Sequence, residues 1–266
     1  MRKYLKKVLI GFLVSLLIYT IGFSIWISDK HVVPILVYHH IDGKAELDLT
    51  SVSPESFDQQ MAYIKKNEFK VITLDELVQA ITQGKKISPK SVVISFDDGY
   101  EDNFTHAFPV LKKYGFSAIF FLPSDLLGAE GFMTWDQVRV MVQDGMEIGS
   151  HTQTHIYLPT YPSLERVQDE IRGSKIVLEK ELGIEIKYFC YPSGGFSEEI
   201  KNLLKQAGYK GACTTNRGFD RYNKDIYELK RIRMKDNNNT NFDMWAKLSG
   251  YYNLFRHFKK PFTRVF

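Results

Sequence analysis

Cysteine is scarce in this sequence: the chain has 266 residues and two cysteines, Cys190 and Cys213. The two do not have the short spacing that zinc sites built on thiolates use, so we exclude a site of that kind. Both lie in apolar, strand-like runs, and we expect two buried thiols. The chain also lacks low-complexity segments and internal repeats. Its 44% hydrophobic and 25% charged residues are typical of a folded globular protein.

Excess positive charge is missing from the main part of the chain, although the formal net charge is +4. Arg2, Lys3, Lys6 and Lys7 precede the first apolar run, and without them the chain has 31 basic and 31 acidic residues. The last twenty residues contain five basic residues and no acidic one, so the middle of the chain is slightly acidic. Nucleic-acid-binding domains usually carry a basic face, and we expect no nucleic-acid partner.

An uncharged apolar run extends over residues 8–27. As a helix rising about 1.5 Å per residue it would span about 30 Å, enough to cross a bilayer. A cleaved signal peptide would have a shorter apolar region ending in small residues, whereas this run ends in Ile25-Trp26-Ile27, and no cysteine follows for a lipid anchor. We expect an uncleaved transmembrane anchor over residues 1–30. The basic flank predicts a single pass of the cytoplasmic (inner) membrane, with the main domain on the extracytoplasmic side.

From Pro34 onward, strand-like and helix-like segments alternate. Short apolar runs predict buried strands at 35–40, 92–96, 118–122, 146–150, 188–191, 211–215 and 228–232. Capping patterns predict helices that begin near Ser53, Thr73, Thr134 and Ser197, and a long helix is predicted from about Ser163 to Gly183. The alternation predicts an α/β fold with a parallel sheet, and seven strands in about 200 residues favour a closed or nearly closed barrel. This domain would occupy residues 31–246, followed by a basic aromatic tail at 247–266.

Two of the predicted strands lead directly into ionisable residues. One ends in Asp97-Asp98-Gly99, where two adjacent buried carboxylates would repel without a cation or proton between them and the glycine allows a sharp turn. Another leads into His151 and His155, whose i, i+4 spacing lets both imidazoles reach one metal ion. Because both groups lie at strand ends of one predicted barrel, we favour a metal site over a solvated Asp-Gly turn or a chance histidine pair.

Two further strand ends carry polar groups. The first strand ends in His39-His40, and alternation places these side chains on opposite faces, so one of them should point into the barrel. A hydrogen-bonded core histidine is the alternative interpretation. Another strand ends in residues 191–195, Tyr-Pro-Ser-Gly-Gly, where glycines allow close approach of the backbone to a substrate and exposed N–H groups can stabilise an oxyanion.

Together these motifs resemble those of the NodB-homology polysaccharide deacetylases, a carbohydrate esterase family. The sequence FDDG at 96–99 matches the family's first motif, and HTQTH at 151–155 matches its H-[ST]-x-x-H motif. The resemblance implies that Asp97 is the general base. It also implies one divalent metal ion with three ligands: Asp98, His151 and His155. The family fold is a distorted (β/α)7 barrel, which agrees with the strand pattern.

The resemblance covers residues 33–235 but departs from the family's most familiar members in two places. Their R-x-P-Y motif corresponds here to residues 190–193, Cys-Tyr-Pro-Ser, so the arginine that orients the base is absent there. Arg231, or alternatively Arg217, is a candidate to replace it. Their late Leu-x-His motif, which supplies the acid, corresponds here to residues 229–231, which contain no histidine.

The sequence Tyr38-His39-His40-Ile41 resembles a different branch of the family. It is similar to the circularly permuted branch, which includes the poly-β-1,6-N-acetylglucosamine N-deacetylases of biofilm matrices. In that branch the first histidine of Tyr-His-x-[Ile/Val] is the general acid, which implies this role for His39.

The resemblance further implies metal-assisted hydrolysis of an N-acetylated polysaccharide, with acetate as a product. Zn²⁺ suits two imidazoles and one carboxylate, although such sites accept other divalent ions. We expect the backbone N–H of Ser193 to stabilise the oxyanion, and Tyr157 and Tyr191 to contact the substrate. An O-acetyl esterase acting on a xylan-type glycan and a catalytically silent saccharide-binding protein are the alternatives. The second would be expected to lack the base or a metal ligand.

Overall fold

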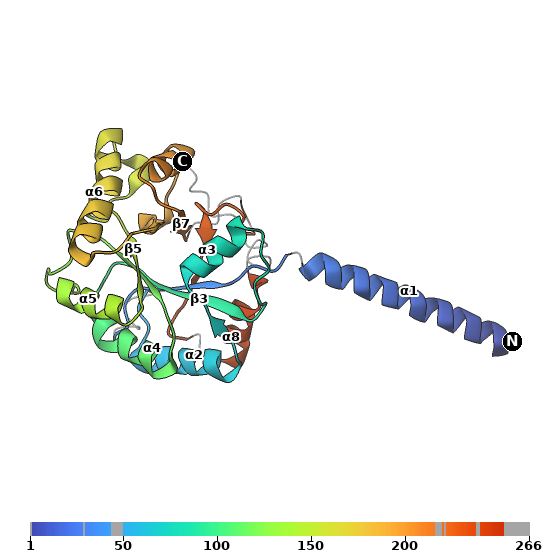
Figure 1. The fold of residues 1–266 in the computed structure, drawn as a ribbon. Coiled ribbons are helices and arrows are strands. Elements are labelled where there is room, and N and C mark those ends of the chain that lie inside the picture. Colours follow the sequence, from blue (N-terminus) through green and yellow to red (C-terminus); the bar gives the residue numbers. More distant parts are fainter. Residues whose placement is uncertain are drawn as a thin grey trace.

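Nine short strands lie at the centre of the part of the chain that the computed structural model describes, residues 2–28, 30–43, 50–215, 220, 222–237 and 240–252 (Figure 1). They are β1 (Ile35–Tyr38), β2 (Lys70–Val71), β3 (Ser91–Phe96), β4 (Ile119–Leu122), β5 (Glu147–Ser150), β6 (Tyr188–Cys190), β7 (Gly211–Thr214), β8 (Leu229–Lys230) and β9 (Ile232–Arg233). All seven predicted strands are confirmed to within two residues at each end. The sequence did not predict β2, which is short and partly exposed.

Parallel pairing closes these strands into a nearly complete barrel. The order around the sheet is β8-β7-β6-β5-β4-β3-β1-β9, with β2 beside β3, and every strand pairing in the described part of the chain is parallel. Strand β8 pairs with β7 and β9 pairs with β1, while Arg231 alone separates β8 from β9. One chain segment therefore joins the two edges of the sheet, and the predicted barrel of parallel strands is confirmed.

Helices surround this barrel (Figure 1). The α-helices are α1 (Arg2–Ser28), α2 (Pro54–Lys66), α3 (Leu74–Thr82), α4 (Phe108–Tyr114), α5 (Trp135–Gln143), α6 (Leu164–Leu182), α7 (Glu198–Gln206) and α8 (Asn241–Leu248). Short helical segments are η1 (Asn103–Ala107), η2 (Leu158–Thr160) and η3 (Pro192–Gly194). The five predicted helix starts are confirmed, because the hydroxyl at each of them accepts the backbone N–H three residues later: Ser53, Thr73, Thr134, Ser163 and Ser197. The sequence did not predict η1, α4 or α8.

Strand alternation divides the core into two clusters. On β3, Val92 and Ile94 pack outward against the helices, whereas Val93 between them faces the barrel interior. The interior cluster also contains apolar residues of α3, which closes the amino-terminal end of the barrel. Cys190 and Cys213 are both buried and free, as predicted, and belong to this interior cluster. Because this cluster fills the amino-terminal part of the barrel interior, the polar side chains that point inward lie at the carboxyl ends of the strands.

The N-terminal residues form helix α1, which projects away from the barrel (Figure 1). A helix that crosses a bilayer needs about 20 predominantly apolar residues. Over the residues that the structure describes, no helix combines the length and the apolarity that a membrane span requires. The transmembrane helix predicted over residues 1–30, and membrane attachment through it, are therefore not supported.

The boundary predicted between residues 246 and 247 falls inside α8, which continues to Leu248. Lys247 is buried, and its Nζ donates a hydrogen bond to the carbonyl oxygen of Arg233 at 2.5 Å. The backbone N–H of Val32 donates to the carbonyl of Gly250. The first residues of the predicted tail thus pack against the barrel, while residues 253–266 lie outside the described part of the chain.

Candidate active site

Side chains from four separate strand ends meet inside the barrel: His39 after β1, Asp97 after β3, His151 after β5 and Arg231 between β8 and β9. Alternation explains their direction. Leu229 belongs to the interior cluster, so the side chain two residues later on the same segment also points inward. Because parallel strands place their carboxyl ends at one edge, residues far apart in the sequence converge there.

A second group of side chains lies beside them. Oδ1 of Asp98 is 3.3 Å from Nε2 of His151 and 3.2 Å from Nε2 of His155. Nδ1 of His151 lies 2.7 Å from the carbonyl oxygen of Cys190. A carbonyl oxygen can only accept a hydrogen bond, so Nδ1 carries a proton, and in this tautomer the lone pair of Nε2 points toward Asp98.

These residues fit a divalent metal ion. Oδ1 of Asp98 is buried and has no hydrogen-bond partner among the described residues, a need that a cation would meet. Ligand atoms about 2.0–2.2 Å from a tetrahedral ion lie about 3.3–3.6 Å apart, and both distances are close to the lower end of this range. The side chain of His151 is 2% exposed and that of His155 is 35% exposed. The group thus opens to solvent beside His155.

Charge interactions within this group agree with metal binding. Burial raises the pKa of Asp98, but the neighbouring His151 and His155 outweigh it and hold that pKa well below its ordinary value. In return, the carboxylate of Asp98 raises the pKa of His155. A metal ion that binds here would compete with protons for these ligand atoms.

Asp97 is paired with Arg231 rather than with the histidines of this group. Nη1 and Nη2 of Arg231 donate to Oδ1 and Oδ2 of Asp97, each at 2.6 Å. The guanidinium also contacts Ser95 at 3.3 Å and the sulfur of Cys190 at 2.9 Å. Burial raises the pKa of Asp97, but Arg231 outweighs it and lowers that pKa overall, so the carboxylate stays ionised. The alternative arginine, Arg217, lies outside the described residues.

The two histidines after β1 have different surroundings. Nε2 of His39 lies 3.8 Å from Oδ2 of Asp97. His40 is turned elsewhere: its Nδ1 lies 2.6 Å from Oδ2 of Asp102, and its ring stacks on Tyr100 with centroids 3.5 Å apart. Burial lowers the pKa of His39, although Asp97 opposes this shift. Strand alternation therefore places His39, and not His40, beside Asp97.

The residues predicted to contact substrate differ in their exposure to solvent. Ser193 is exposed in a tight turn that follows β6, and the ring of half-buried Tyr157 packs against Gly195, where any side chain would collide with it. Tyr191, in contrast, is 1% exposed, and its hydroxyl donates to the carbonyl of Tyr227. Cys190 faces the barrel interior, so alternation turns Tyr191 outward under the helices. This burial does not favour the predicted contact between Tyr191 and substrate, and alternation in the sequence already points the side chain outward.

Left-handed backbone conformations gather in this region. Four non-glycine residues here have positive φ: Asp98 (72°), Thr152 (67°), His155 (61°) and Ser193 (54°). Each such conformation costs on the order of 1 kcal/mol or more and persists only where surrounding contacts hold it. Strained backbone of this kind is characteristic of functional sites.

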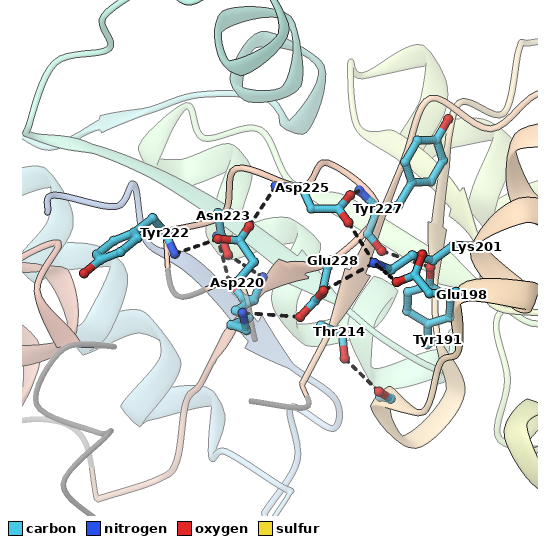
Figure 2. A network of polar contacts seen from close by, with 12 residues as sticks. Tyr191, Glu198, Lys201, Thr214, Asp220, Tyr222, Asn223, Asp225, Tyr227 and Glu228 are labelled. Atoms are coloured by element: carbon cyan, nitrogen blue, oxygen red, sulfur yellow. Dashed lines mark hydrogen bonds and ion pairs between the residues drawn. The ribbon is translucent and has the colours of Figure 1, made fainter. Parts of the chain in front are cut away.

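A polar network around the buried side chain of Lys201, not foreseen from the sequence, supports the last strands (Figure 2). Nζ of Lys201, on α7, contacts three carboxylates: Asp225 at 2.7 Å, Glu198 at 2.8 Å and Glu228 at 3.4 Å. Thr214 at the end of β7 donates to the carbonyl of Gly194 in the neighbouring turn. These contacts hold the segment that leads into Arg231. Because most partners are far apart in the sequence, local patterns do not reveal them.

Comparisons with known proteins agree on one family. The sequence profile described as polysaccharide deacetylase matches residues 84–212. The Bacillus subtilis (strain 168) protein YxkH, grouped by its name with the polysaccharide deacetylases, is 33% identical over 213 residues, which cover 79% of this chain and 75% of that protein. The poly-beta-1,6-N-acetyl-D-glucosamine N-deacetylase of Staphylococcus aureus (strain MRSA252) is 26% identical over 211 residues, 74% of this chain and 72% of that protein. The solved structure of the Streptococcus pyogenes deacetylase PplD in complex with acetate has a TM-score of 0.71 and 30% identity, over 77% of this chain and 93% of that chain.

Proposed function

The chain belongs to the polysaccharide deacetylase family, and we propose that it hydrolyses the N-acetyl groups of a polysaccharide containing N-acetylglucosamine, with release of acetate. The Staphylococcus aureus relative is named for this reaction on poly-beta-1,6-N-acetyl-D-glucosamine, which supports the substrate class. The observation that carries the proposal is the contrast between two adjacent carboxylates. Asp97 pairs with Arg231, whereas Asp98 faces two imidazoles. Such different surroundings suit one carboxylate to proton transfer and the other to a metal ion.

We propose that the metal is Zn²⁺, held by Asp98, His151 and His155, because two imidazoles and one carboxylate suit this ion. When bound, the ion polarises the acetamide carbonyl and lowers the pKa of water from about 15.7 to about 7. The hydrogen bond from Nδ1–H of His151 to Cys190 orients the ring and aims Nε2 at the site. Elemental analysis of the purified protein identifies the ion.

The remaining residues divide the proton transfers between them. Asp97 accepts a proton from the attacking water; a carboxylate has four lone-pair positions, so two remain after the bidentate pair with Arg231. The backbone N–H of Ser193 donates a hydrogen bond to the developing oxyanion. His39 protonates the sugar nitrogen as the carbon–nitrogen bond breaks, which gives acetate and a free amine. We also assign Tyr157, beside the Ser193 turn, to contact with a sugar ring.

The proposed reaction is tested by acetate release from a panel of glycans. We expect the purified protein to release acetate from polymers of N-acetylglucosamine, because the acid and the base flank a site that is open to solvent beside His155. Dialysis against a chelator should lower release to the background rate, and added Zn²⁺ should restore it. Faster release from O-acetylated xylan would identify an esterase instead. Release that persists after the chelator would contradict the metal mechanism.

Substitution of two neighbouring histidines tests the assignment of the general acid. His39→Ala is expected to lower turnover by at least about 10²-fold, the usual contribution of a general acid, while zinc content stays at the wild-type level. His40→Ala is the matched control and should lose much less, because His40 contacts Asp102 and Tyr100 rather than Asp97. Steady-state rates and zinc content of both variants show which of the two histidines is the general acid. The reverse ranking would contradict the assignment.

We further propose that the deacetylase domain predicted over residues 31–246 is a distorted (β/α)7 barrel that includes the end of α8, with β8 and β9 counted as one strand interrupted at Arg231. Matrix and wall polysaccharides lie outside the cell, so we propose that this domain acts on the extracytoplasmic side of the cytoplasmic membrane. Protease added to intact spheroplasts should then degrade it. A domain protected from protease until the cells are lysed would contradict this location.

A further inference from the structure

The loop that carries the two histidine ligands is held on one side by the segment after β4. Backbone N–H groups of Ser124 and Asp125 donate to the carbonyls of Thr152 and Gln153, at 3.2 and 3.0 Å. Thr152 has a φ of 67°, and His155 has a φ of 61°. Left-handed conformations at non-glycine residues persist only under such restraint. Contacts on the opposite side of the loop are therefore expected to contribute to this restraint.

Glu170 of α6 supplies that opposite side. Its Oε2 accepts the backbone N–H groups of Gln153 and Thr154, both at 2.9 Å, and its Oε1 accepts the hydroxyl of Thr154 at 2.8 Å. Arg166, one turn earlier on the helix, donates to Oε1 at 2.9 Å. The side chain of Glu170 is 0% exposed. Gly173 lets the helix approach closely, because a side chain there would meet the amide of Gln153.

We infer that Glu170 is a positioning residue for the metal site: by binding residues 153 and 154 it keeps His151 and His155 turned toward Asp98. This inference rests on the proposed function, since it takes those three residues as the metal ligands. Two successive N–H groups that converge on one carboxylate oxygen form an anion-binding nest with charge-assisted hydrogen bonds. Without Glu170 these N–H groups lose their partner, and the loop can relax to conformations that separate the ligand atoms.

The test is the Zn²⁺ affinity of the full-length protein, measured by competition with a chromophoric chelator. Glu170→Ala is expected to weaken Zn²⁺ binding about 10–100-fold, as found for the outer partners of metal ligands. Glu170→Gln should weaken it less, because one amide oxygen still accepts the two N–H groups. If the alanine variant does not fold, the glutamine variant, which keeps the size of the side chain, decides.

Glu147→Gln is the matched control. Glu147 begins β5, the strand that ends before His151, and its carboxylate also accepts two backbone N–H groups, from Leu74 at 2.7 Å and Asp75 at 3.2 Å. It lies four residues before His151, about 13 Å along the strand, at the other end of the barrel. The melting temperature of this variant should fall, whereas its Zn²⁺ affinity should stay at the wild-type value.

Three outcomes would overturn the inference, and each is distinct. Zn²⁺ affinity equal to wild type in the Glu170 variants would show that Glu170 only stabilises the fold. Equal weakening in Glu147→Gln would show that affinity follows global stability rather than the position of the loop. A wild-type protein that binds no Zn²⁺ would remove the proposed metal site itself, and with it the role of Glu170.

Discussion

Replacing His155 with alanine is expected to remove the bound metal ion and to lower acetate release to the background rate. His155 is one of three predicted ligands, and the two that remain, Asp98 and His151, do not complete the protein ligand set of a catalytic zinc site. Its side chain is 35% exposed, so truncation should leave the fold intact. Elemental analysis gives the metal content, circular dichroism checks the fold, and acetate release gives the turnover.

Asp97→Asn is the matched comparison, because the altered carboxylate is adjacent to the ligand Asp98 but is not itself predicted to be a ligand. The amide cannot accept the proton of water, so turnover should fall about 10²–10⁴-fold while the metal content stays at one equivalent. Equal metal content in His155→Ala and in the wild type would contradict the ligand assignment. Loss of metal from Asp97→Asn would show that the roles of the two carboxylates had been exchanged.

Replacing Arg231 with methionine is expected to lower the free energy of unfolding by about 3–5 kcal/mol at about pH 7, since it leaves an unpaired buried charge. Asp97 is 3% exposed, and both of its oxygens bind Arg231. Urea unfolding followed by circular dichroism measures the change. The double variant Asp97→Asn/Arg231→Met should be more stable than Arg231→Met alone, because neither charge remains. A double variant that is no more stable would contradict this account.

The stability lost in Arg231→Met should depend on pH. In the wild type the pKa of Asp97 lies below its ordinary value of 3.8, so the pair stabilises the fold above that pH and loses its effect as the pH falls. In the variant, burial without the guanidinium raises the pKa of Asp97, so the folded state gains a proton as the pH falls. The difference in the free energy of unfolding between the variant and the wild type should therefore shrink as the pH falls from about 7 to about 4. A difference that is constant over this range would contradict the buried ion pair.

Local features of the sequence were sufficient to predict most strands and helices and part of the candidate active site. Short apolar runs determined the strands, and short capping patterns determined where helices such as α3 and α5 begin. Both depend on residues within a few positions of one another. Strand alternation placed His39 and His40 on opposite faces, and the motifs at the ends of β3 and β5 indicated Asp98, His151 and His155 as neighbours.

Closure of the barrel determined the remaining contacts of the candidate active site, because it brings together residues that no local pattern relates. Arg231 and Asp97 are 134 positions apart, and their pairing depends on one segment joining β7 to β1 with its side chain directed inward. From the sequence, Arg217 was an alternative. Glu170 could not be recognised as a support of the histidine loop, since its role depends on how α6 packs against the residues after β5. Hydrogen bonds across such separations form only when the whole sheet has its final register, and this is why the tertiary structure alone assigned them.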